Sequence, residues 1–138
     1  MCIRDSLCGN TTTESIDVVI QDDVAPIPIC REVTQVSLGS YTNGLSEVLA
    51  DYFDEGSYDN CGPVEIKVRR MDNSCPEESQ DEDDFNDEIH FCCDDIGETV
   101  MVVLRVYDVN VPSGSIDEDE AIEHSNDCMI EVLSLIHI

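Results

Sequence analysis

The sequence has no tryptophan and few aromatic or basic side chains. Only 5% of its 138 residues are aromatic, and six are Lys or Arg, with Lys67 the single lysine. Because large rings are scarce, a core must be filled by Val, Ile and Leu together with disulfides. The 32 acidic residues give a net charge of -26, and a surface of this sign repels nucleic acid phosphates and anionic lipids. We therefore expect no nucleic acid partner.

Long apolar runs and catalytic motifs are also missing. No stretch approaches the roughly 18 apolar residues that a membrane-spanning helix needs, and the start of the sequence has no charged region followed by an apolar run. We expect no membrane insertion, with export directed by sequence outside this segment. No G-x-S-x-G, H-E-x-x-H or glycine-rich phosphate loop occurs, which predicts a protein that is not an enzyme.

Cysteine is what the sequence has in excess. The chain contains eight cysteines, and none of them forms a CxxC motif. In a chain this short, such a distribution is typical of a disulfide framework made in an oxidising compartment. The sequence therefore predicts an extracellular or cell-surface protein.

Both ends of the sequence look foreign to the rest. Residues 1–6 and 133–138 resemble translated sequencing-adapter read-through, so we leave them out of the fold prediction. Residues 21–28 contain two prolines and an Asp pair, which interrupt strand pairing and indicate a linker. A new domain is expected to begin near Asp23.

Alternating apolar and polar residues predict several short strands. In residues 64–70, Val64, Ile66 and Val68 are expected to face the interior. The other strands are expected at residues 15–20, 29–33, 35–38, 88–93, 99–107 and 127–132, while residues 46–53 could form a strand or a helical turn. Two acidic loops, residues 73–88 and 112–126, lie between the later strands. Six or seven short strands without a long amphipathic helix predict an all-β sandwich.

Several motifs taken together resemble a known family. In chain order they are PIPIC, DEGSYDNC, VRRMDNSC, FCCDDIG, VMVVLRVYDVN and NDCMIEV. This set resembles a hyalin-type (HYR-like) repeat, of the kind found in tandem in large secreted bacterial surface proteins of the gliding-motility or type IX secretion type. The match covers residues 23–132. Residues 7–22 resemble the last strand and exit linker of a preceding repeat, and depart from it at Glu14, where that strand's cysteine is expected.

The resemblance implies a fold and a function. The fold is an immunoglobulin-like antiparallel β-sandwich of about seven strands, stapled by disulfides. The function is that of a non-catalytic structural or adhesive module, whose partners are neighbouring repeats of the same polypeptide. The alternative is a Ca²⁺-dependent carbohydrate- or protein-binding module that uses the two acidic loops to hold an extracellular ligand.

Cys92 and Cys93 are expected to have different partners. Alternation with Ile89 and Phe91 directs Cys93 to the core and Cys92 outward. The residues alone leave the pairing of the six domain cysteines open. The resemblance implies the pairs Cys30–Cys128, Cys61–Cys93 and Cys75–Cys92, and Cys8 is left without an assigned partner.

A zinc site is the competing interpretation of the same cysteines. His90, Cys92, Cys93 and Cys75 are ligand types that lie close together in the sequence. Adjacent ligands that point to opposite faces of a strand cannot both reach one tetrahedral ion without distortion. Disulfides are therefore favoured.

Acidic side chains near the expected ends of the sandwich are candidate Ca²⁺ ligands, because this ion needs several oxygen atoms. The candidates are Asp22, Asp23, Asp54, Glu55, Asp59, Asp108 and Asn110. Asp108 is the most informative, since its alternation with Val106 directs the carboxylate inward or to the rim, where it needs a donor or a cation. We favour the plainer interpretation that Asp108 accepts backbone hydrogen bonds and that Asp59 forms an Asx turn. No other cofactor is expected.

Overall fold

The structure is a computed structural model of the whole chain, and it describes residues 2–5, 9–20, 22–38, 45–72, 75, 85–109 and 124–136. Within these residues the chain forms strands and two single turns of 3-10 helix, with no α-helix. The elements are β1 (Cys2–Asp5), β2 (Thr11–Glu14), β3 (Val33–Leu38), β4 (Ser46–Leu49), η1 (Ala50–Tyr52), β5 (Val64–Arg70), β6 (Glu88–Phe91), η2 (Cys93–Asp95), β7 (Thr99–Asp108) and β8 (Ser125–Ile136).

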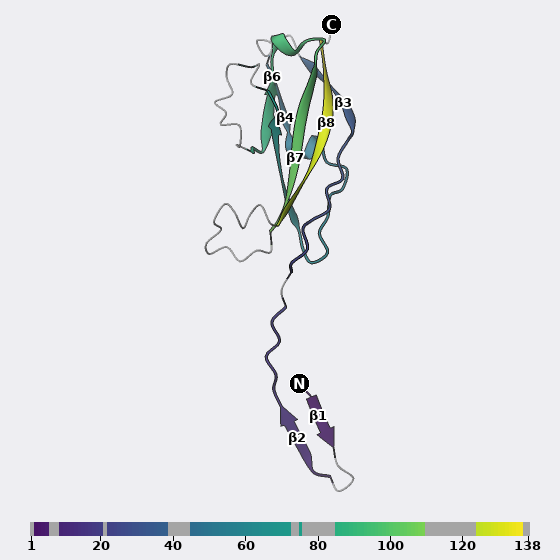
Figure 1. Cartoon of the computed structure of the whole chain (residues 1–138), viewed down its shortest axis with the longest axis vertical. Helices are drawn as coiled ribbons and strands as arrows, with labels where there is room; N and C mark the ends of the chain where they lie inside the picture. The colour runs from purple at the N-terminus through teal and green to yellow at the C-terminus, as the bar shows by residue number, and fades with distance from the viewer. Residues whose placement is uncertain are drawn as a thin grey trace.

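The body of the molecule is a β-sandwich of two unequal sheets. The larger sheet has the strand order β3-β8-β7-β5, and the smaller sheet consists of β4 and β6 (Figure 1). The pairs β7–β8, β5–β7 and β4–β6 are antiparallel, whereas β3 runs parallel to β8. The all-β sandwich predicted from the sequence is therefore correct, and the pairing of the first and last strands of the sandwich is the one exception to its antiparallel order among the described strands.

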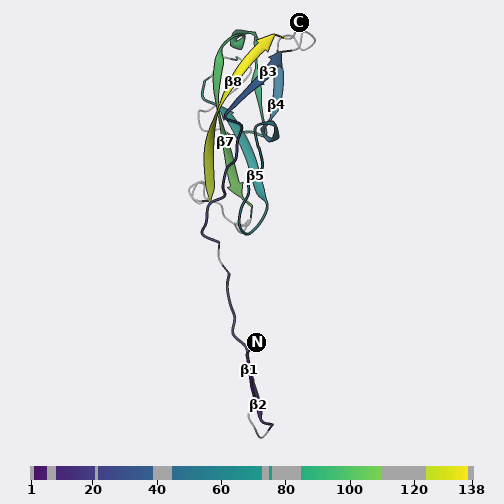
Figure 2. The same cartoon turned by 90° about the vertical axis from the view of Figure 1, so that its right-hand side faces the viewer.

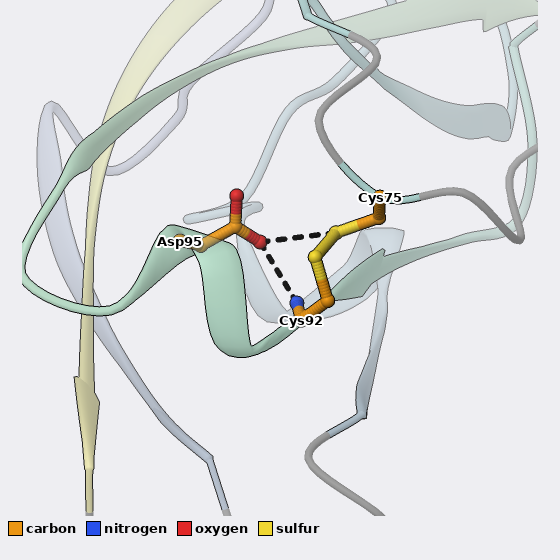
Figure 3. A group of neighbouring side chains, drawn as sticks. All are labelled: Cys75, Cys92 and Asp95. Atoms are coloured by element: carbon orange, nitrogen blue, oxygen red, sulfur yellow. Dashed lines mark hydrogen bonds between the residues drawn. A yellow bond between two sulfur atoms is a disulfide. The ribbon is translucent and has the colours of Figure 1, made fainter.

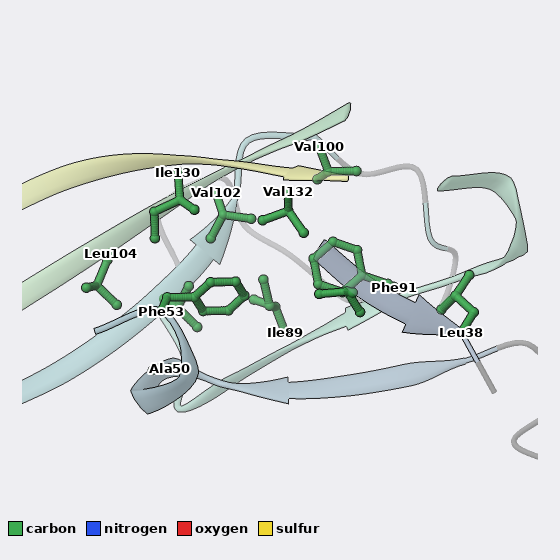
Figure 4. Packing of buried hydrophobic residues seen from close by; sticks show 12 residues of the cluster. Leu38, Ala50, Phe53, Ile89, Phe91, Val100, Val102, Leu104, Ile130 and Val132 are labelled. Atoms are coloured by element: carbon green, nitrogen blue, oxygen red, sulfur yellow. The ribbon is translucent and has the colours of Figure 1, made fainter. Parts of the chain in front are cut away.

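The two sheets enclose one hydrophobic core, shown in Figure 4. Val102 and Leu104 of β7 contribute from the large sheet, Ile89 and Phe91 from β6, and Phe53 from the turn after η1, and all of them are fully buried. Each such side chain contributes roughly 1.5–3 kcal/mol relative to an exposed position. Aliphatic residues and two phenylalanines, Phe53 and Phe91, thus make up most of the core cluster of a chain that has no tryptophan.

Strand β8 extends further than the sequence predicted. The prediction ended at Val132, but Leu133 and the residues up to Ile136 pair with Gln35–Leu38 of β3, and Ser134 is fully buried. Residues 133–136, which the sequence analysis set aside, therefore belong to the sheet. The reason is that β3 needs hydrogen-bond partners along its whole length. Glu131 and Val132 pair only with Val33 and Thr34, so the rest of β3 pairs with the residues that follow them in β8.

Two predicted strands are not formed. Residues 15–20 are extended but pair with no strand among the described residues, and their apolar side chains are exposed. Before Val33, the stretch 29–33 contributes only an isolated bridge from Cys30 to Asp54. Residues 46–53 were predicted to form a strand or a helical turn, and they form one after the other, β4 followed by η1.

The N-terminal hairpin stands apart from the sandwich. Strands β1 and β2 pair only with each other, and both views show them separated from the body by an extended segment (Figures 1 and 2).

The described residues contain no helix with the length and apolar character that crossing a membrane requires.

Candidate cation site at the linker end

Three of the predicted Ca²⁺ ligands meet where the linker joins the sandwich. Asp22 comes from the linker, Asp59 from the turn before β5, and Asp108 from the end of β7. One carboxylate oxygen of each lies within 4.8 Å of the others. Two ligands of one Ca²⁺ ion, each at 2.3–2.6 Å, lie at most about 5 Å apart, so these three oxygens are spaced closely enough to share an ion.

Local hydrogen bonds fix the orientation of two of these carboxylates. Asp22 Oδ1 accepts from the Val24 N–H at 3.1 Å, and Asp59 Oδ2 accepts from the Cys61 N–H at 2.9 Å. Both are Asx-type contacts to a residue two positions ahead. The Asx turn predicted for Asp59 is therefore present, and it coexists with the cluster.

Asp108 is placed by the sheet. It is the last residue of β7, its Cα is in register with Val64 of β5, and its N–H donates to the His124 carbonyl at 3.0 Å. It is only 8% exposed, in line with the inward orientation predicted from its alternation with Val106. The sheet thus presents one carboxylate at its rim, and the two turns bring the others to it.

In Asp22 and Asp59, the carboxylate oxygen that does not take part in the Asx-type contact lacks a hydrogen-bond donor. Asp22 Oδ2 and Asp59 Oδ1 are buried, and no described group completes a hydrogen bond to them. No salt bridge among the described residues involves either Asp22 or Asp59. A buried carboxylate oxygen without a donor is costly, so the arrangement favours a bound cation.

Cys61 reports the negative potential of this cluster. A hydrogen bond to Asp22 raises the pKa of the Cys61 thiol, and desolvation and the charges of Asp22, Asp59 and Asp108 raise it further. The pKa of Asp22 is lowered, chiefly by the Val24 N–H and by the Cys61 side chain.

The remaining predicted ligands lie elsewhere or have other roles. Asp54 accepts hydrogen bonds from the backbone of Gly56 and Ser57 and from the Ser57 hydroxyl, and Glu55 pairs with Arg31 at 3.9 Å. Asp23 is exposed and outside the cluster. Asn110 lies outside the described residues, as do the acidic loops except at 75, 85–88 and 124–126.

The structure contains two disulfides. Cys30 is joined to Cys128, with Cα atoms 6.4 Å apart, and Cys75 is joined to Cys92, with Cα atoms 5.8 Å apart. These are two of the three expected pairs. With Cys75 and Cys92 bonded to each other, the competing zinc site of His90 with these cysteines is not formed.

The third expected pair, Cys61–Cys93, is wrong, because both residues are exposed and neither is in a disulfide. Cys61 lies before Val64 at one end of β5, and Cys93 opens η2 beside Arg70 at the other end. Seven strand residues span about 20 Å, whereas a disulfide needs Cα atoms closer than about 7 Å.

The expected directions of Cys92 and Cys93 are also reversed. Cys92 is 7% exposed and Cys93 is exposed. The alternation fails because β6 ends at Phe91 and η2 begins at Cys93. Once the backbone turns into a helix, the two-residue period of the strand no longer applies.

A buried ion pair next to the Cys75–Cys92 disulfide was not predicted. Arg70 and Asp95 are each 2% exposed. The Arg70 Nη1 and Nη2 groups donate to the two Asp95 oxygens at 2.8 and 2.7 Å, and the Cys92 N–H donates to Asp95 Oδ2 at 2.8 Å. Figure 3 shows the Asp95 carboxylate directed at the disulfide and the Cys92 amide. Burial raises the pKa of Asp95, but the hydrogen bonds from Arg70 and Cys92 outweigh burial and lower it overall.

One sequence signal could have revealed this pair. Arg70 has the same parity in its strand as Val64, Ile66 and Val68, so the alternation that predicted their burial also directs Arg70 inward. A buried arginine needs a carboxylate. Asp95, in a turn close to the core cysteines, is the residue that provides it.

Comparisons of this chain with protein-family models, with curated proteins and with solved structures found no match.

Proposed function

We propose that this chain is a non-catalytic structural or adhesive module of a secreted or cell-surface multi-domain protein, joined to a preceding module through the linker at residues 21–28. In this proposal, residues 15–20 are the closing strand of the preceding module. The family resemblance suggested this role, and the burial of side chains in the structure supports it independently.

The supporting observation is a match between residues 15–20 and strand β8. Ile16, Val18 and Ile20 stand in the same alternation as Ile130, Val132 and Ser134, at a constant offset along the chain. In β8 all three positions are fully buried, whereas Ile16, Val18 and Ile20 are 67%, 77% and 88% exposed. The same alternation of positions is therefore buried in β8, where the third residue is a serine, and exposed in residues 15–20.

An exposed apolar strand of this kind is expected to have a partner. Burying each of these side chains would contribute roughly 1.5–3 kcal/mol. In tandem repeats, a unit that cannot cover its own apolar face is covered by sequence from its neighbour. Residues 15–20 have the pattern to complete a sandwich like this one, and the disulfides suit the oxidising surroundings of a secreted array.

A strand graft tests the proposal. Residues 129–134 are replaced by the sequence SIDVVI of residues 15–20, which places Ile, Val and Ile at the three buried positions and keeps Cys128. We expect this variant to unfold cooperatively at a temperature within a few degrees of the parent. The matched control inserts the same residues in the order IDVVIS, which moves Asp to the buried position of Ile130 and both Ile side chains to the outward positions 129 and 133. If the graft unfolds as readily as the control, residues 15–20 are not a closing strand.

The second candidate function is Ca²⁺-dependent binding of a carbohydrate or protein. The observation that favours it is the convergence of Asp22, Asp59 and Asp108, with two buried oxygens that lack donors. An ion held there would tie the linker to the turn before β5 and to the end of β7, and would stiffen the junction with a preceding module. The acidic loops would then present the ligand.

Thermal unfolding in millimolar Ca²⁺ and in chelator tests the ion, and a glycan array with and without chelator tests the ligand. An ion at a hundred times its Kd stabilises the folded state by about 2.7 kcal/mol, so a rise of several degrees is expected. Asp54→Asn is the control, because that carboxylate serves a turn outside the cluster. An unchanged melting temperature removes this candidate.

A further inference from the structure

The outer face of the small sheet brings two glutamates and a histidine together. Glu47 of β4 is directly opposite His90 of β6 in the antiparallel register. Glu88 precedes His90 by two residues and therefore lies on the same face. Ile89 and Phe91 alternate with them and are fully buried in the core. The register thus places three ligand-type side chains on the solvent side.

These side chains are close enough to share one ion. The Glu47 Oε2 and His90 Nε2 atoms are 3.9 Å apart, and the two side chains are 58% and 35% exposed. One ligand atom from each of Glu47, Glu88 and His90 lies within 4.8 Å of the others. Ligands of a tetrahedral Zn²⁺ ion at 2.0–2.2 Å lie about 3.4 Å apart, so small rotations of exposed side chains suffice to close the site.

We propose that Glu47, Glu88 and His90 form a site for one divalent cation of the zinc class. The imidazole distinguishes this cluster from the many acidic groups on the surface, because Ca²⁺ and Mg²⁺ select oxygen whereas imidazole suits Zn²⁺, Cu²⁺ and Ni²⁺. Three protein ligands, with water in the fourth position, form an open zinc site. The ion would cross-link β4 and β6, which form a two-stranded sheet of a kind that is marginal alone.

This site is independent of the proposed module function. It lies on the sheet that contains neither Asp22, Asp59 nor Asp108, and it takes a different class of ion. Failure of either proposal leaves the other unaffected.

Titration of the oxidised full chain with zinc chloride tests the site. Excess Ca²⁺ is present throughout to occupy oxygen-only sites on this acidic protein. We expect one Zn²⁺ ion to bind per chain with micromolar affinity, and the ring signals of His90 to shift or broaden in the proton NMR spectrum. His90→Gln and the double change Glu47→Gln/Glu88→Gln should each weaken binding by about tenfold or more, a loss that even outer-shell partners of metal ligands can cause.

Matched variants identify binding at other groups. His124→Gln alters a histidine away from the small sheet, and Glu131→Gln alters an exposed carboxylate on β8, so both should bind Zn²⁺ as the parent does. Circular dichroism checks that each variant is folded. Equal affinity in the parent and His90→Gln overturns the proposal, because binding then comes from thiols or scattered acids. Absence of binding at millimolar Zn²⁺ overturns it as well.

Discussion

Carboxylates lie near both ends of strand β5, and their surroundings at the two ends are opposite. At the Arg70 end, Asp95 receives hydrogen bonds from the guanidinium group and from the Cys92 amide, and both of its oxygens have partners. At the Val64 end, Asp22 and Asp59 lie beside Asp108, and each has a buried oxygen without a donor among the described residues. One end contains its own counter-charge, and the other is open to a cation.

The same contrast extends to the apolar surface. The Arg70 end is closed by the buried Cys75–Cys92 disulfide and by η2. The other end leads into the linker and the exposed residues 15–20. This contrast is what the proposed module function requires: a packed body at the Arg70 end and, at the other end, a junction with a neighbouring module.

The largest expected effect concerns the disulfide that anchors the chain after the linker. Cys30 and Cys128 are 98 residues apart in sequence, and closing a loop of that size contributes about 4–5 kcal/mol in the chain-entropy model. Cys30→Ser/Cys128→Ser should lose about this much stability in urea unfolding. Cys61→Ser, at an exposed cysteine outside the disulfides, is the control and should change stability little. A double variant as stable as this control would show that the first and last strands are held by the sheet alone.

Breaking the Arg70–Asp95 ion pair should cause the next largest loss of stability. Asp95→Asn leaves the buried Arg70 guanidinium with an incomplete partner, and breaking a buried pair costs about 3–5 kcal/mol. We expect a loss near the lower value, because Arg70 keeps Asp72, whose Oδ1 lies 2.7 Å from Nη2. Denaturant titration measures it, with the exposed neighbour Asp94→Asn as control. Equal stability of the two variants would contradict the contrast between the ends.

The same carboxylate predicts a smaller pH effect. The pKa of Asp95 is lowered in the folded protein from its ordinary value of 3.8, so its contribution to stability is complete above that value and is lost as the pH falls through the lowered pKa. Between pH 5 and about pH 3, the parent should therefore lose more stability than Asp95→Asn. Parallel curves for the two proteins would show that Asp95 does not titrate in this way.

At the linker end, an Asp→Asn substitution should have the opposite effect on the stability of the folded protein. In chelator, Asp59→Asn removes one of three adjacent negative charges, while the amide oxygen can still accept from the Cys61 N–H. Relief of like-charge repulsion should raise stability by about 0.5 kcal/mol, the scale of single surface changes. In millimolar Ca²⁺ the variant should be less stable than the parent. Destabilisation in chelator would mean that this end, like the other, is already neutralised.

Periodicity predicted the sandwich because burial on one face of a strand is a local property. The buried positions of β7 and the inward direction of Asp108 follow from alternation alone. Asp22, Asp59 and Asp108, which lie together in the structure, were all among the candidate Ca²⁺ ligands predicted from the sequence. Cys92 and Cys93 could not be placed, because the point where β6 turns into η2 depends on the Asp95 side chain and its contact with Arg70, 25 residues earlier. The Glu47–His90 register is likewise a long-range pairing that no local pattern encodes.

The most direct test of the open junction is hydrogen exchange at residues 15–20. The fusion protein places residues 23–124 of one copy before residues 11–138 of a second copy, with Glu14→Cys in the second copy to restore the partner of Cys30. Residues 15–20 then occupy the position of β8 in the first module. We predict that their amides, which should exchange freely in the single chain, become protected to the level of β8 in the fusion. Amides that exchange equally fast in both proteins would contradict the proposal that this segment closes a neighbouring module.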